Sequence, residues 1–212
     1  MACVGGTDKM SAGMPVGGVR TYAQLEPDRP FNFENWGEAV RAGRTFSTSG
    51  PLMGLKVDGR PMGAEVRLTG GRGTVEVEAS AECAWPISQL EVVMNGKVVA
   101  QVTEGAGAKS LRLHEKVEVK GSCWLAARAS SALHVQHAWP IFVAAHTSPI
   151  YVVVPDSDLF NPSDATYMLT LIDGGLTYLD TLSVRYDEQR HREMKAIYQH
   201  ARDHLLGRMH SH

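Results

Sequence analysis

The sequence predicts a mainly β chain: an antiparallel, immunoglobulin-like β-sandwich that follows a short N-terminal α/β segment and precedes a pair of helices. Short runs of alternating apolar and polar residues, separated by Gly, Pro, Asn or Asp, predict the strands. Two apolar stripes at helical spacing near the end of the chain predict the helices. We therefore divide the chain into residues 1–44, 45–155 and 156–212.

The N-terminal segment, residues 1–44, contains one expected strand end and one expected helix. Met1–Val4 is short and apolar and precedes two glycines, so we expect it to be the end of a buried strand. We expect the rest of its sheet to lie outside this sequence, because nothing precedes it. A helix is expected over residues 33–42, with Asn32 as its N-cap and Gly43 at its end.

The middle segment carries the sandwich. Residues 75–80 alternate apolar and polar side chains, which is the pattern of a half-buried strand. The pair Asn95-Gly96 lies between two apolar runs and predicts a hairpin, because a type I′ turn needs positive φ at both central residues. About eight short strands without a long helix predict an antiparallel sandwich. The remaining candidate strands are residues 52–57, 64–68, 111–119, 122–129, 139–144 and 149–154.

The C-terminal segment is expected to form two helices. Asn161 is a good N-cap, and Pro162 suits the first helical position. A wide apolar stripe follows, and Gly174-Gly175 interrupts it, which predicts a kink or a close contact between helices. The second helix is expected over residues 184–207.

Composition excludes several classes of protein. Hydrophobic residues make up 43% of the chain and charged residues 21%, as in ordinary globular proteins. The formal net charge of −2 excludes binding to nucleic acid by bulk positive charge. No apolar run approaches the ~20 residues of a membrane-spanning helix. The three cysteines favour free thiols, with a single Cys83–Cys123 bridge as the alternative.

Three residues are candidate metal ligands. Asp8 follows the expected strand end, a place where α/β proteins present catalytic or metal-binding carboxylates. Its alternative role is to cap a loop or helix N–H. His200 and His204 are four residues apart on an expected helix and so project from one face. They lack the H-E-x-x-H pattern of a metalloprotease, so packing or solvent-facing histidines are the alternative.

Two other features have a functional and a structural interpretation. His146 and Ser148 pair a base with a nucleophile, but nothing like G-x-S-x-G surrounds the serine. We therefore expect this stretch to hydrogen-bond a turn. Trp85 and Trp139 each precede a proline, and they either pack at an edge of the sandwich or form a platform for a sugar.

Three stretches carry a resemblance to one family; they are residues 5–11 with 16–22, residues 36–51, and residues 123–128 with 146–152. In order, they resemble the end of the catalytic domain, the joining segment and the late sandwich strands of CehA/McbA-type metallohydrolases. These enzymes are relatives of the PHP (polymerase and histidinol phosphatase) phosphoesterases. The most specific run is A-G-R-T-F-S-T-S-G-P at residues 42–51.

The resemblance implies a function for the chain. The catalytic domain of this family is a distorted β/α barrel that holds divalent metal, and some members hydrolyse carbamate esters. Asp8 falls where such domains end with a metal-binding Asp, whereas Met10 stands where many relatives have His. Hydrolysis by a metal needs about three protein ligands. We therefore expect the C-terminal accessory portion of a metal-dependent hydrolase, with a divalent metal in the full-length parent and none in this chain alone.

Two kinds of partner follow from this hypothesis. One is the missing PHP-like catalytic domain, and the other is a second copy that associates through the apolar surface the barrel would have covered. We expect that surface on residues 1–44 and on the helices of residues 162–207. The alternative function is a carbohydrate- or protein-binding module that uses the loops around Trp85 and Trp139. A third is a small metal-dependent enzyme that uses Asp8 with His200 and His204.

Overall fold

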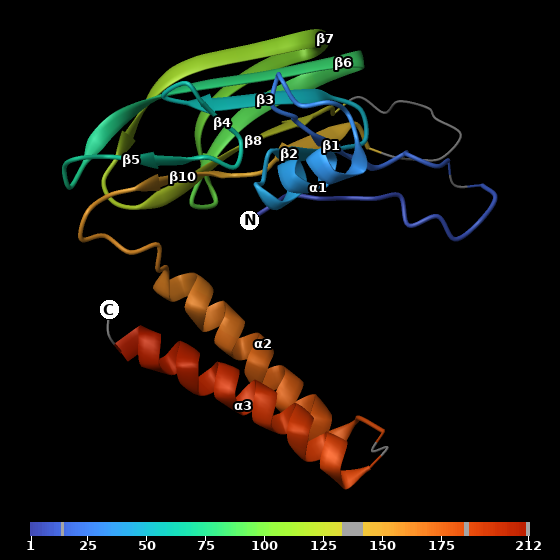
Figure 1. The fold of residues 1–212 in the computed structure, drawn as a ribbon, viewed down its shortest axis with the longest axis vertical. Coiled ribbons are helices and arrows are strands. Elements are labelled where there is room, and N and C mark those ends of the chain that lie inside the picture. Colours follow the sequence, from blue (N-terminus) through green and yellow to red (C-terminus); the bar gives the residue numbers. More distant parts are fainter. Residues whose placement is uncertain (14, 133–141, 185–186, 211–212) are drawn as a thin grey trace. The chain divides into compact units, whose positions relative to one another are not determined.

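The computed structural model describes residues 1–212 except 14, 133–141, 185–186 and 211–212. The chain forms two compact units, Met1–Asp158 and Leu159–His212. The first unit is mainly β, and the second consists of two helices (Figure 1). The predicted fold class is therefore confirmed.

The strands of the first unit join into one ten-stranded sheet in the described part of the chain. Its main order is β1-β2-β9-β8-β6-β3-β4, while β7 pairs with β6 and β10 pairs with β8 and β5. Every pairing is antiparallel except that of β10 with β5. The strands are β1 Arg20–Ala23, β2 Thr45–Thr48, β3 Leu52–Val57, β4 Arg60–Pro61, β5 Glu65–Arg67, β6 Gly73–Met94, β7 Lys97–Val119, β8 Cys123–Ser130, β9 Ala144–Thr147 and β10 Ile150–Val153.

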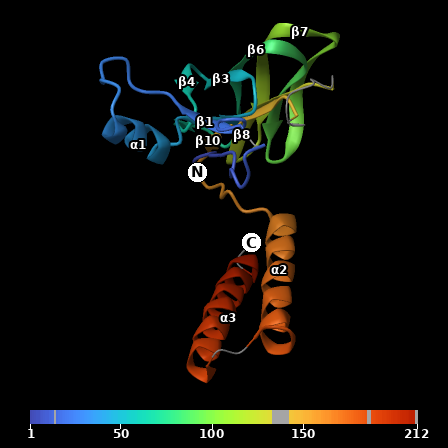
Figure 2. The same cartoon turned by 90° about the vertical axis from the view of Figure 1, so that its right-hand side faces the viewer.

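Two long strands, β6 and β7, make the sheet curl. The first part of β6 pairs with β3 and the second with β8, and the register to β7 shifts between Glu82 and Ile87. One strand thus contributes to both sides of the curled sheet, which Figure 2 shows from a second direction. The expectation of only short strands is wrong here, because β6 has 22 residues and β7 has 23.

The core lies inside the curl. Val75 and Val77 are fully buried, while Glu76 and Glu78, which alternate with them, are exposed, as the pattern predicts. Burying a side chain of this size stabilises the fold by roughly 1.5–3 kcal/mol. The largest fully buried side chains, from several strands, are those of Ile87, Leu90, Leu125 and Ile150.

Local signals are confirmed at the hairpin and the first helix. Asn95 and Gly96 have φ of +47° and +83° between β6 and β7, as a type I′ turn requires. Helix α1 spans Phe33–Arg41, and the Asn32 side chain accepts a hydrogen bond from the Asn35 N–H at 2.8 Å. Gly43 follows the helix with φ of +69°.

The expected strand end at Met1–Val4 is wrong. This stretch has no strand structure, and Val4 is exposed. The strand β2, whose Thr45 contacts this segment, already pairs with β1 on one edge and with β9 on the other. The segment is held by side chains instead: the Cys3 N–H donates to Ser148 Oγ at 2.8 Å.

The second unit is a helical hairpin of α2, Pro162–Thr181, and α3, Glu188–His210. Asn161 caps α2, as predicted, by accepting from the Ser163 N–H at 3.0 Å. Gly175 lies against the ring of Tyr198, so the glycine pair marks a close contact between helices. None of the helices in the described ranges is long and apolar enough to cross a membrane.

Candidate functional site

The predicted metal ligands lie in different compact units of the chain. Asp8 is exposed in the irregular N-terminal segment and has φ of +46°. His200 and His204 are exposed on α3, in the other compact unit. No group of three His, Cys, Asp or Glu side chains that could hold a metal ion occurs in the part of the chain that the structure describes. The roles of Asp8, His200 and His204 as metal ligands stay predictions.

The other candidate residues from the sequence are Ser148, Trp85 and Trp139. Ser148 is fully buried, and its hydroxyl lies 2.7 Å from Thr45 Oγ1 and accepts from the Cys3 N–H, so it is unavailable as a nucleophile. Trp85 is 37% exposed and lies beside Gly50, whereas Trp139 falls outside the described residues. The sugar platform stays a prediction.

The cysteines carry no disulfide. Cys3, Cys83 and Cys123 are free thiols, so the alternative of a Cys83–Cys123 bridge is not realised. Cys123 lies in the core, and burial raises the pKa of its thiol from 9.0 to about 11. A thiol that stays protonated is a poor nucleophile, so Cys123 serves packing.

Apolar side chains are exposed in both segments where we expected them. In residues 1–44 they include Val4, Met10, Val16, Phe31 and Phe33. On the helical hairpin they include Met168, Leu171, Tyr178, Met194 and Ile197. The partners that would cover these side chains stay a prediction.

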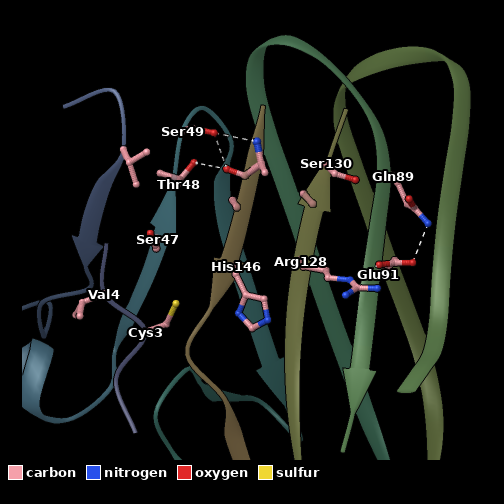
Figure 3. A pocket seen from close by; sticks show the side chains of 14 residues that line it. Cys3, Val4, Ser47, Thr48, Ser49, Gln89, Glu91, Arg128, Ser130 and His146 are labelled. Atoms are coloured by element: carbon pink, nitrogen blue, oxygen red, sulfur yellow. Dashed lines mark hydrogen bonds and ion pairs between the residues drawn. The ribbon is translucent and has the colours of Figure 1, made fainter. Parts of the chain in front are cut away.

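The most distinctive polar feature of the first unit is a groove of about 680 Å³ on the outer face of the sheet (Figure 3). Four side chains in one cross-strand row line it. Ser47 on β2 is opposite His146 on β9, which is opposite Arg128 on β8, which is opposite Glu91 on β6. Side chains on adjacent strands at matched register point to the same face of a sheet.

The inward neighbours explain why this row faces outward. Phe46, Thr147, Ala127 and Val92 each adjoin a member of the row in sequence, and all four are buried. Because side chains alternate between the two faces of a strand, burying these neighbours in the core forces the polar row to the other face.

Glu91 and Arg128 form the charged centre of the groove. The Glu91 side chain is 11% exposed, and such a carboxylate is stable only when it is paired. Arg128 Nε donates to one of its oxygens in an ion pair, and Gln89 Nε2 donates to the other at 2.8 Å. Both carboxylate oxygens therefore have a donor.

His146 lies next to this pair with its imidazole exposed. Figure 3 shows the ring between Cys3 on one side and Arg128 on the other. Its Nδ1 is 2.7 Å from the carbonyl oxygen of Thr147. A carbonyl only accepts hydrogen bonds, so this contact assigns the proton to Nδ1 and leaves Nε2 open to a ligand.

The N-terminal segment forms one wall of the groove. Cys3 and Val4 line it, together with Val19. Thr45 Oγ1 donates to the Cys3 carbonyl at 2.8 Å, and the Gly5 N–H donates to Thr21 Oγ1 at 2.8 Å. These hydrogen bonds hold the segment across the strands and bring it beside the polar row.

Sequence reasoning missed the central pair of the groove. Glu91 interrupts an apolar run at an outward position. This pattern predicts that the carboxylate is either exposed or paired, but it does not identify the partner. Arg128 is 37 residues away, and only the register of β6 with β8 brings the two together.

Comparisons with known proteins add little to this geometry. No protein-family model matches the chain, and no curated protein matches it. One solved structure is similar, a neutron crystallographic structure of a lytic polysaccharide monooxygenase from Jonesia denitrificans. The two are 12% identical with a TM-score of 0.26, over 66% of this chain and 79% of that chain. A likeness this weak carries no argument about function.

Proposed function

We propose that this chain serves as the accessory β-sandwich lobe of a PHP-like metal-dependent hydrolase and has no hydrolytic activity by itself. The observation that carries the proposal is a convergence in space. The segments that resemble CehA/McbA-type metallohydrolases are far apart in sequence, yet their strands are neighbours. β2 pairs with β9, β9 with β8, and β8 with β10.

The same segments also supply the groove. Ser47 comes from the second resembling stretch, Arg128 and His146 come from the two parts of the third, and all three residues line the groove. The core of a sandwich forms without exposed polar side chains at matched register. We therefore attribute the polar side chains that line the groove to binding. This arrangement supports a role in which the lobe presents the groove to a catalytic domain and shapes its substrate entrance.

The partner in this proposal is a PHP-like catalytic domain, on the same polypeptide or a separate one. Exposed apolar side chains lie on the N-terminal stretch that resembles the end of such a domain, including Met10 and Val16. An exposed apolar set of this kind is typical of a surface that another domain covers. The divalent metal would belong to that catalytic domain, with Asp8 as the one residue this chain could add.

An activity assay tests the first half of the proposal. The purified chain is incubated with Mn²⁺ or Zn²⁺ and with 1-naphthyl methylcarbamate or p-nitrophenyl phosphate. We expect no turnover above the metal-only blank. Turnover that disappears in Asp8→Asn but persists in Asp28→Asn, a matched exposed aspartate, would overturn the proposal because it would reveal a complete active centre in this chain.

A reconstitution experiment tests the second half. The chain is mixed with a PHP-like catalytic domain from the same organism that carries an H-x-H motif. We expect a stoichiometric complex whose KM differs from that of the catalytic domain alone. Val4→Asp should weaken the complex, whereas Val98→Asp, a matched exposed valine on β7, should not. Absence of any complex or of any change in KM counts against an accessory lobe.

A further inference from the structure

Several polar side chains in the groove have unused hydrogen-bonding capacity. Arg128 engages Glu91 through Nε alone, so its two Nη groups have no partner among the described residues. The Arg128 side chain is half exposed and lines the groove. His146 Nε2 and the Ser130 hydroxyl, which also line it, likewise have no partner in the described ranges.

Glu91 fixes the position of this guanidinium. Its carboxylate is nearly buried and receives donors from Gln89 and Arg128, so it acts as an internal counterion. An arginine held through Nε keeps its two Nη groups, a planar fork of N–H donors, for a second acceptor. The arrangement is therefore a preorganised site for an oxyanion.

The charge balance selects among oxyanions. Glu91 cancels the charge of Arg128, and His146 adds none while it is neutral. The cost of removing an anion from water rises more steeply with its charge than does its attraction to this neutral pair, so the site favours a monoanion over a dianion. A carboxylate is monoanionic, and its two oxygens match the guanidinium fork. The wall residues Val4 and Val19 add apolar surface for the group attached to it.

We infer that the groove binds a carboxylate-bearing organic molecule, with Arg128 as the bidentate donor and the Ser130 hydroxyl as a flanking donor. This inference deepens the proposed function and rests on it only in treating the molecule as a substrate of the hydrolase. The binding itself belongs to this chain, so it can be measured without a catalytic domain.

Benzoate is the probe, and it is titrated into the isotope-labelled full chain while NMR signals of His146 and Arg128 are followed. We expect saturable shifts at both residues with benzoate, none with the neutral isostere benzamide, and weaker binding of inorganic phosphate. Arg128→Lys retains a cation for Glu91 but loses the fork, so affinity should fall about tenfold or more. Arg112→Lys, which alters the 3.1 Å ion pair with Glu82 outside the groove, should leave affinity unchanged.

A second variant keeps the test decisive if Arg128→Lys does not fold. Ser130→Ala removes only the flanking hydroxyl, and we expect it to weaken benzoate binding about threefold or more with the fold intact. Equal binding of benzoate and benzamide, or tighter binding of phosphate, would overturn the inference. If benzoate binds but the chain forms no complex with a PHP-like domain, the proposed function is refuted and the carboxylate site is supported.

Discussion

Substituting Gly175 by Ala probes the packing of the helical hairpin. A Cβ at this position would lie 2.3 Å from Cε1 and 3.0 Å from Cδ1 of the Tyr198 ring. Ordinary contact begins at 3.4 Å, so the ring or the helix must move by about 1 Å. Overpacking of this kind costs about 1–3 kcal/mol, and the better helix propensity of Ala returns about 1 kcal/mol. We expect a net loss of about 1 kcal/mol.

The neighbouring Gly174 is a matched control. A Cβ there meets nothing within 4 Å, so Gly174→Ala should stabilise α2 by up to about 1 kcal/mol. Native-state hydrogen exchange of α2 and α3 amides in the full chain measures both effects. In a Tyr198→Ala background the two alanines should become equivalent. A Gly175→Ala loss that persists without the Tyr198 ring would refute the steric reasoning.

Three further predictions concern the β unit. Leu125→Ala, at a fully buried side chain, should lower the free energy of unfolding in urea by about 2–5 kcal/mol, and a loss below 1 kcal/mol would contradict the assigned core. Burial raises the pKa of the Cys123 thiol to about 11 in the folded chain, so between about pH 9 and 11 the thiol ionises only when the chain is unfolded. The free energy of unfolding of the wild type should therefore fall by up to about 2 kcal/mol more than that of Cys123→Ala over this range, and parallel pH profiles would contradict this. Ser148→Ala removes the hydroxyl that accepts from the Cys3 N–H, so iodoacetamide should label Cys3 faster, and an unchanged rate would show that other contacts hold the segment.

Features set by a few neighbouring residues were predictable from the sequence. The caps at Asn32 and Asn161 and the turn at Asn95-Gly96 each depend on local hydrogen bonds or on φ, and the structure confirms all three. The alternation around Val75 likewise reports burial on one face of a strand. Such signals depend on a few neighbouring residues, so they do not depend on how the rest of the chain folds.

Predictions that depended on distant partners fared worse. The sequence predicts only short strands, yet the structure continues β6 through Pro86, at the register shift between Glu82 and Ile87. A shift in register tolerates a proline because the ladder is already interrupted there. Met1–Val4 has strand composition, but no open edge of β2 remains to pair with it. Neither fact can be read from local sequence.

The groove also depends on distant partners, and its function has to be tested by two separate measurements, one of binding and one of coupling to a catalytic domain. Arg128 and Glu91 become a site only through the register of β8 with β6, and His146 joins them only through β9. A hydrolase lobe and an independent binding module would both use this face, so binding of benzoate alone does not separate them. The distinction lies in coupling: in a lobe, occupancy of the groove must change the KM of a catalytic domain, and Arg128→Lys must remove that change. In a binding module, the same substitution weakens the ligand and alters nothing else.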